Sequence, residues 1–173
     1  MDAGGEIQWQ KCLGGTKDDY ARTVLQTPDD GFIVVGLTWS DDGDVSEIHS
    51  EYNDNWVVKL GGAGEIQWQK CFGGTGAEQA YTAIQTIDGG YLIAGESSSN
   101  DGDVSSNHGG YDAWLVKFNS AGEIQWQNPM AERAMMMLNL SIKPKMADLS
   151  WLEKPSPTMA MSPVFTAEWI SRS

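Results

Sequence analysis

A six-residue segment, Gly-Glu-Ile-Gln-Trp-Gln, occurs three times in the chain, at residues 5–10, 64–69 and 122–127. The first two copies continue into Lys-Cys, one apolar residue and Gly-Gly-Thr, whereas the third copy breaks off. Other motifs recur at nearly the same spacing, among them Asp-Gly-Asp-Val-Ser, which begins at Asp42 and again at Asp101. Self-similarity of this kind requires one structural unit per repeat, so it limits the chain to a repeat architecture.

Within a repeat, short strand-like segments alternate with turn residues. In the first repeat these segments are residues 6–12, 21–27, 32–38 and 55–60. The third contains consecutive β-branched residues, as expected of a strand that is covered on both faces, and the Pro-Asp-Asp-Gly sequence before it favours a hairpin turn. Four antiparallel strands per unit match a β-propeller blade better than a sandwich or a solenoid coil.

The sequence therefore predicts an all-β fold of two four-stranded antiparallel, propeller-like blades, followed by the first strand of a third blade. The first repeat or blade spans residues 5–63, the second spans 64–121, and the first strand of the third spans 122–127. We expect residues 128–173 to form a poorly ordered tail, because their composition is unlike that of the repeats.

The composition changes abruptly at Gln127. All 20 Gly lie at or before Gly122, whereas seven of the eight Met lie after Gln127. Read one base out of frame, codons that fit the tail restore repeat motifs; residues 145–149, for example, yield Asp-Gly-Gly-Phe, the counterpart of Asp-Gly-Gly-Tyr at 88–91. We hypothesise that residues 128–173 are a frameshifted third repeat, which was never selected to fold. The nucleotide sequence tests this hypothesis.

The motif order in residues 5–127 resembles a known family. It runs from Trp through Gly-Gly-Thr and Gln-Thr-x-Asp-x-Gly-aromatic to Asp-x-Trp-Val-Val-Lys-Leu. This order is similar to the seven-bladed β-propeller repeats of secreted and cell-surface proteins of the Bacteroidetes. The resemblance implies an extracellular parent protein, often exported by type IX secretion, with other repeats of the same array as partners. No signal peptide opens the chain, so we interpret it as an internal fragment of a larger array.

Charge and hydropathy exclude two classes of partner. The formal net charge of −13 argues against nucleic acid, because phosphates would be repelled. No apolar run is long enough to span a membrane. A protein or a glycan remains as the expected ligand.

One loop per repeat carries closely spaced carboxylates. Asp42 and Asp44 flank a Gly in the first repeat, and Asp101 and Asp103 do so in the second. This spacing is typical of a calcium loop, although the distal Glu of a helix-loop-helix site is missing. Asp and Gly also form turns without a metal, which is the interpretation we favour. Calcium is the only cofactor that the sequence suggests.

Aromatic residues and cysteines recur at equivalent positions. We expect the repeated Trp residues (Trp9, Trp68, Trp126, Trp56 and Trp114) to pack between blades, because large aromatic side chains dominate core energetics. Cys12 and Cys71 are interpreted as small, half-buried strand residues without a disulfide. Trp39 aligns with Ser98 and has no aromatic counterpart, so it is the candidate for an exposed ligand surface.

The residues do not form a catalytic constellation, since each of the two His stands alone in a loop. We therefore predict a non-catalytic repeat module with a binding or scaffolding role. The alternative is a fragment of a propeller-based hydrolase or oxidoreductase whose active site lies outside this piece. Symmetry separates the two predictions, because an enzyme breaks its repeats with unique polar residues, whereas these repeats differ mainly by conservative changes.

Overall fold

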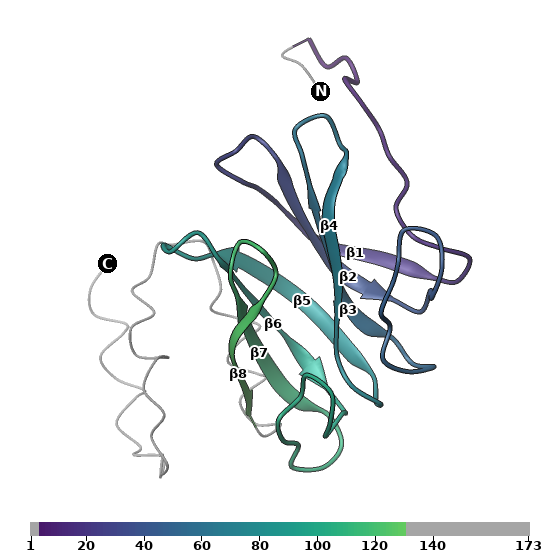
Figure 1. The fold of residues 1–173 in the computed structure, drawn as a ribbon, viewed down its shortest axis with the longest axis vertical. Helices are drawn as coiled ribbons and strands as arrows, with labels where there is room; N and C mark the ends of the chain where they lie inside the picture. The colour runs from purple at the N-terminus through teal and green to yellow at the C-terminus, as the bar shows by residue number, and fades with distance from the viewer. Residues whose placement is uncertain (1–3, 131–173) are drawn as a thin grey trace.

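The computed structural model describes residues 4–130, which form two four-stranded antiparallel sheets (Figure 1). In each sheet the strands are neighbours in sequence order. Sheet 1 contains β1 (Asp19–Gln26), β2 (Phe32–Thr38), β3 (Asp54–Leu60) and β4 (Ile66–Phe72). Sheet 2 contains β5 (Glu78–Gln85), β6 (Tyr91–Ser97), β7 (Asp112–Phe118) and β8 (Ile124–Met130). The all-β prediction is confirmed for the described residues. Within that range, no helix is long and apolar enough to cross a membrane.

The sheets are offset from the sequence repeats. The last four residues of the second copy lie in β4, which pairs with β3, and those of the third copy lie in β8, which pairs with β7. Residues 122–127 therefore complete sheet 2, and the prediction that they begin a third blade is wrong. A short glycine turn explains the pairing: Gly64 has a φ of 84° and its N–H donates to the carbonyl of Gly61 at 3.0 Å. This turn folds each copy directly back onto the strand before it.

The first copy behaves differently from the other two. Residues 6–12 are not part of a strand, and the first strand begins at Asp19. The expected strand at 6–12 is thus corrected. The difference is one of pairing, because the other copies pair with β3 and β7, whereas residues 6–12 belong to neither sheet of the described range.

The predicted tail begins inside β8. Asn128 and Pro129 pair with Leu115 and Trp114, so the first residues of the segment 128–173 are ordered in sheet 2. From residue 131 onward, the predicted frameshifted tail lies outside the described residues.

Both sheets contain the same bulge in their first strand. The register shifts between Ala21 and Thr23 in β1, and between Ala80 and Thr82 in β5. Gly36, opposite the bulge in sheet 1, has no room for a side chain, because an added Cβ would collide with the carbonyl of Tyr20. Gly95 meets the carbonyl of Gln79 in the same way. The recurring glycine therefore allows the bulged strand to approach its neighbour.

The two sheets are stacked so that non-equivalent faces are in contact. We call one side of each sheet its forward face. This face carries Ile33, Val35 and Val57 in sheet 1, and the equivalent residues Leu92, Ala94 and Leu115 in sheet 2. The rear face carries Val34, Val58 and Leu60 in sheet 1, and Ile93, Val116 and Phe118 in sheet 2. The main core joins the forward face of sheet 1 to the rear face of sheet 2. β5 lies against β1, β2 and β3, as Figure 1 also shows.

Candidate functional site

The Gly-Gly-Thr and Asp-Gly-Asp motifs of the first repeat form one structure. Asp42 Oδ1 accepts a hydrogen bond from the N–H of Thr16 at 2.7 Å, and Asp44 Oδ2 accepts one from the N–H of Gly14 at 3.4 Å. Two segments that are far apart in the sequence are thereby fixed to each other by carboxylate-to-backbone contacts.

The second repeat has the same arrangement. Asp101 accepts hydrogen bonds from the N–H and the hydroxyl of Thr75, at 2.7 and 2.8 Å, and these bonds lower the pKa of Asp101. Asp103 Oδ2 accepts a bond from the N–H of Gly73 at 3.2 Å. Among residues 4–130, no group of three or more His, Cys, Asp or Glu side chains could hold a metal ion. Each of the four aspartates predicted to bind calcium thus has a backbone partner, and calcium binding stays a prediction.

A carboxylate at the start of the first strand of each sheet supports the same loops. Glu78 is fully buried and accepts hydrogen bonds from the hydroxyls of Ser97 and Ser99, at 2.7 and 2.5 Å, and from the N–H of Gly74 at 3.1 Å. In sheet 1, Asp19 takes the equivalent place. Its partners are Thr38, Ser40 and the N–H of Gly15. Sequence reasoning missed this feature, although an acidic residue four positions after the second Gly of Gly-Gly-Thr marks it in both repeats.

The two histidines contact aspartates at the start of the third strand of each sheet. Nδ1 of His49 lies 2.5 Å from Oδ2 of Asp54, and Nδ1 of His108 lies 2.8 Å from Oδ2 of Asp112. His49 also reaches toward sheet 2, where its Nε2 lies 3.7 Å from Asp103. The pairs orient the loops between the second and third strands, and the first pair links the two sheets.

Burial and charge act in opposite directions on the first of these pairs. Burial lowers the pKa of His49, but the hydrogen bond to Asp54 and the charges of Asp54, Asp103 and Glu78 outweigh it, so the pKa is raised. Burial also raises the pKa of Asp54, against the opposing effect of His49. Asp54 is fully buried, and its Oδ1 has no hydrogen-bond partner.

Trp39 lies directly after β2 and is half-buried. Its ring meets that of Tyr20 edge-on, with centroids 6.0 Å apart and an interplanar angle of 77°. Tyr20 is 49% exposed, so the pair presents aromatic surface at one end of sheet 1. The second repeat has Gln79 and Ser98 at these positions, which makes the aromatic pair specific to sheet 1.

Among the described residues, Trp56 and Trp114 are buried and Trp68 and Trp126 pack against core clusters, whereas Trp9 is 38% exposed. Trp114 is fully buried in the cluster between the sheets, and Trp68 packs against that cluster, edge-on to Phe118. For these two residues, the predicted packing between blades is confirmed. Trp56 and Trp114 also donate from Nε1 to the side chains of Gln69 and Gln127, at 2.8 and 2.7 Å, which explains why Gln follows Trp in the hexapeptide.

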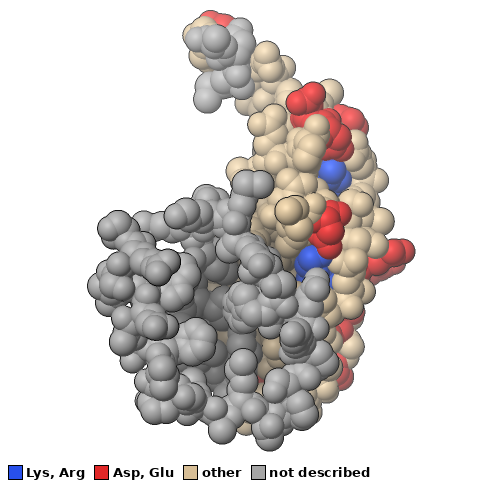
Figure 2. Space-filling view, turned by 90° about the vertical axis from the view of Figure 1, so that its left-hand side faces the viewer, with Lys and Arg blue, Asp and Glu red and all other residues tan. Residues whose placement is uncertain are grey.

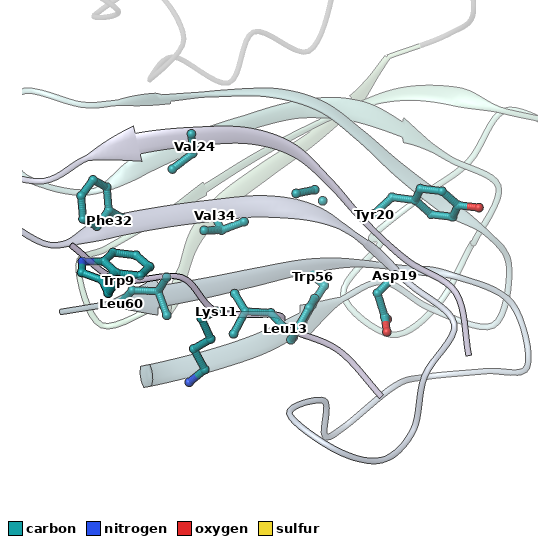
Figure 3. A pocket seen from close by; sticks show the side chains of 12 residues that line it. Trp9, Lys11, Leu13, Asp19, Tyr20, Val24, Phe32, Val34, Trp56 and Leu60 are labelled. Carbon is teal, nitrogen blue, oxygen red and sulfur yellow. The ribbon is translucent and has the colours of Figure 1, made fainter. Parts of the chain in front are cut away.

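A cleft of about 480 Å³ lies on the rear face of sheet 1. Figure 3 shows Val24, Phe32 and Val34 of the sheet on one side and Trp9, Lys11 and Leu13 of the N-terminal segment on the other. Trp9 Nε1 donates to the carbonyl of Gly62 at 2.9 Å and its ring meets Phe32 edge-on, so the segment is fixed at one point along the cleft. The cleft is mainly apolar, and Val24 within it is 63% exposed.

These features define an all-β repeat protein in which two equivalent sheets are braced by the same polar contacts. In comparisons with known proteins, no protein-family model and no curated protein matches the chain.

Proposed function

We propose that this chain is a non-catalytic repeat module of a secreted or cell-surface β-propeller protein, of the type found in the Bacteroidetes, with a binding or scaffolding role. The observation that carries the proposal is the head-to-tail contact, in which the rear face of sheet 2 covers the forward face of sheet 1. Successive blades of a propeller need this relation, because each blade must pack on the next in the same sense.

The duplicated polar contacts support scaffolding. Lys59 reaches Asp29 at 3.0 Å in sheet 1, and Lys117 reaches Asp88 at 2.7 Å in sheet 2. The same duplication holds for the carboxylates of Asp19 and Glu78 and for the His–Asp pairs described above. Groups that recur with equivalent partners in both repeats support the structure of each repeat, which favours a scaffolding role.

The surface charge supports a partner other than nucleic acid. The formal net charge is −13, and Figure 2 shows acidic side chains in red along the visible edge of the described residues, with fewer basic ones between them. Such a surface repels phosphate groups and favours a neutral or cationic partner.

The ligand surface that we propose is the pair of Tyr20 and Trp39. Aromatic rings offer large flat contact areas at low conformational cost, which suits a sugar ring or a protein side chain. Polar residues flank the pair in sequence. The Lys17 ammonium forms an ion pair with Asp41 at 3.2 Å, and the backbone N–H of Lys17 donates to the hydroxyl of Ser40. An aromatic platform beside charged groups matches a glycan, and we take glycans as the first class to test.

A glycan array probed with the full chain tests the proposal. Trp39→Ser introduces the residue of the second repeat, and we expect binding to weaken about tenfold, on the order of 1.4 kcal/mol, because the stacking surface is lost. Tyr111→Ser is the matched control, since Tyr111 is 43% exposed but lies in the loop before β7. Cleavage of a bound glycan, the absence of any binding, or equal binding by Trp39→Ser would contradict the proposal.

A further inference from the structure

The rear faces of the two sheets carry equivalent residues but differ in how far these residues are buried. In sheet 2 the rear face packs on sheet 1, and Ala83 and Ile93 are 4% and 0% exposed. Their equivalents in sheet 1, Val24 and Val34, line the cleft, and Val24 is 63% exposed. The cleft is therefore the place where sheet 1 lacks the neighbour that sheet 2 has.

The N-terminal segment occupies on sheet 1 the position that β4 occupies on sheet 2. A Cβ added to Gly64 would lie 2.8 Å from the ring of Trp9, and one added to Gly122 would lie 3.0 Å from the ring of Trp68. Trp9 and Trp68 are equivalent residues of the hexapeptide, and each packs against the glycine turn of the following unit. Residues 6–12 thus lie where the fourth strand of a preceding sheet would lie.

We propose that the cleft and residues 7–12 together form the docking surface for one further sheet of the same repeat. Three strands, equivalent to β1, β2 and β3, would pair with residues 7–12 as their fourth strand. Their forward face, with residues equivalent to Ile33, Val35 and Val57, would fill the cleft. The occupant is a neighbouring repeat of the array, so this inference rests on the proposed repeat-module function.

The chemistry of the cleft fits this occupant. The contact between sheets 1 and 2 joins branched aliphatic residues of a forward face to aromatic and aliphatic residues of a rear face. The cleft offers the same classes of residue, namely Val24, Phe32, Val34 and Leu60. Burial of such surface contributes roughly 25 cal/mol per Å², which gives a docked sheet a strong driving force.

The chain contains a natural reporter for this docking. Cys12 is exposed, whereas its equivalent in β4, Cys71, is 7% exposed. Burial raises the pKa of Cys71 to about 12, so its thiolate is scarce at neutral pH. A docked sheet would place Cys12 in the environment of Cys71 and make it unreactive toward thiol reagents.

The test inserts a second copy of residues 5–63 between Gly4 and Gly5 of the full chain, with Cys12 of the added copy changed to Ser. We expect labelling of the original Cys12 by a thiol reagent to slow at least about tenfold, because reaction then requires local opening. In the control chain the added copy carries Ile33→Asp, Val35→Asp and Val57→Asp, and Cys12 should react as fast as in the unmodified chain.

Labelling of Cys71 reports whether the existing sheets stay folded. Equal labelling of Cys12 in the extended and control chains, with Cys71 still protected, would overturn the inference. Exposure of Cys71 in the extended chain would also overturn it, because the added repeat would then have displaced β4 rather than docked. Protection of Cys12 in the unmodified chain at rising concentration would assign the surface to a second copy instead. None of these outcomes depends on glycan binding, so the failure of either proposal is visible separately.

Discussion

Sheets 1 and 2 share strand order, register and the bulge in the first strand, but their first strands differ in burial. Most residues of β1 are exposed, whereas most residues of β5 are buried or half-buried. The difference arises because β5 lies against three strands of sheet 1, while β1 borders the open cleft. Equivalent residues thus acquire their burial from the neighbouring sheet and not from the pattern of their own repeat.

The sequence has adjusted to this contact at particular positions. Ala83 stands where sheet 1 has Val24, and Phe118 stands where it has Leu60. Phe118 packs between the sheets. The centroid of its ring lies 5.3 Å from the ring centroid of Phe72 and 5.5 Å from that of Tyr91. A small residue at Ala83 and a large one at Phe118 fit the close packing of this contact.

The largest difference between the sheets is expected when a charged residue is introduced into the first strand of each sheet and the loss in free energy of unfolding is compared. Ala83→Asp buries an unpaired carboxylate and should lower the free energy of unfolding by about 3 kcal/mol or more, whereas Val24→Asp leaves its charge in water and should cost less than about 1 kcal/mol. Urea unfolding of both variants measures the contrast. Equal losses would show that the face of sheet 1 is as well covered as that of sheet 2.

Truncating one equivalent side chain in the second strand of each sheet should again destabilise sheet 2 more than sheet 1, but by a smaller difference in free energy of unfolding. Ile93 is fully buried between the sheets, so Ile93→Ala should cost about 2–5 kcal/mol through lost burial and the cavity left behind. Val34→Ala removes a half-buried side chain at the edge of the cleft and should cost about 1 kcal/mol or less. Urea unfolding again provides the measurement. A larger loss for Val34→Ala would contradict the assignment of the open face.

The strand segments could be predicted from the sequence because the signals are local. The β-branched run at Ile33 and the turn before it placed β2, and the Asp-x-Trp motif placed β3. Strand pairing could not be predicted in the same way. The alternation around Trp9 is identical to that around Trp68, yet within residues 4–130 it is the second segment that follows a strand, β3, and pairs with it.

The hydrogen bonds between the Gly-Gly-Thr and Asp-Gly-Asp motifs could not be predicted from the sequence either. Both motifs can be recognised in each repeat, but Thr16 and Asp42 are separated by 26 residues, and hydrogen bonding between them depends on the fold. The carboxylates of Asp42 and Asp101 resemble metal ligands in sequence because the same oxygen atoms can accept backbone N–H bonds. The partner of a carboxylate is therefore settled by tertiary contacts.

The lysine–aspartate pairs of the two sheets are expected to differ in how strongly the lysine lowers the pKa of its aspartate. Lys117 is the main cause that lowers the pKa of Asp88 to about 2, whereas Thr27 is the main cause for Asp29, followed by Lys59. Lys117→Met should therefore raise the pKa of Asp88 toward 3.8 by more than Lys59→Met raises that of Asp29. NMR titration of the carboxyl carbons measures both.

The stability effect of these pairs follows from the direction of the shifts. Because the pKa of each aspartate is lower in the folded chain than its ordinary 3.8, the stabilisation is present above about pH 4 and is lost as the pH falls toward 2. Acid unfolding of the two Lys→Met variants should show a weaker dependence on pH in that window. An unchanged acid limb in both variants would contradict a stabilising role for the pairs.

The smallest effect is expected at His49, which faces the next sheet through Asp103. Its pKa is raised above 6.5, so its stabilisation is present below that pH and is lost as the pH rises through the folded value. Asp103→Asn removes one of the charges that raise it, while the amide oxygen can still accept the bond from Gly73. We therefore expect the pKa of His49 to fall while the hydrogen bond from the N–H of Gly73 to residue 103 is kept. Proton NMR of the imidazole signals measures the shift, with His108 in sheet 2 as the internal reference. Because Asp103 belongs to the sheet 2 repeat, an unchanged titration of His49 would show that the sheets are not coupled at this point.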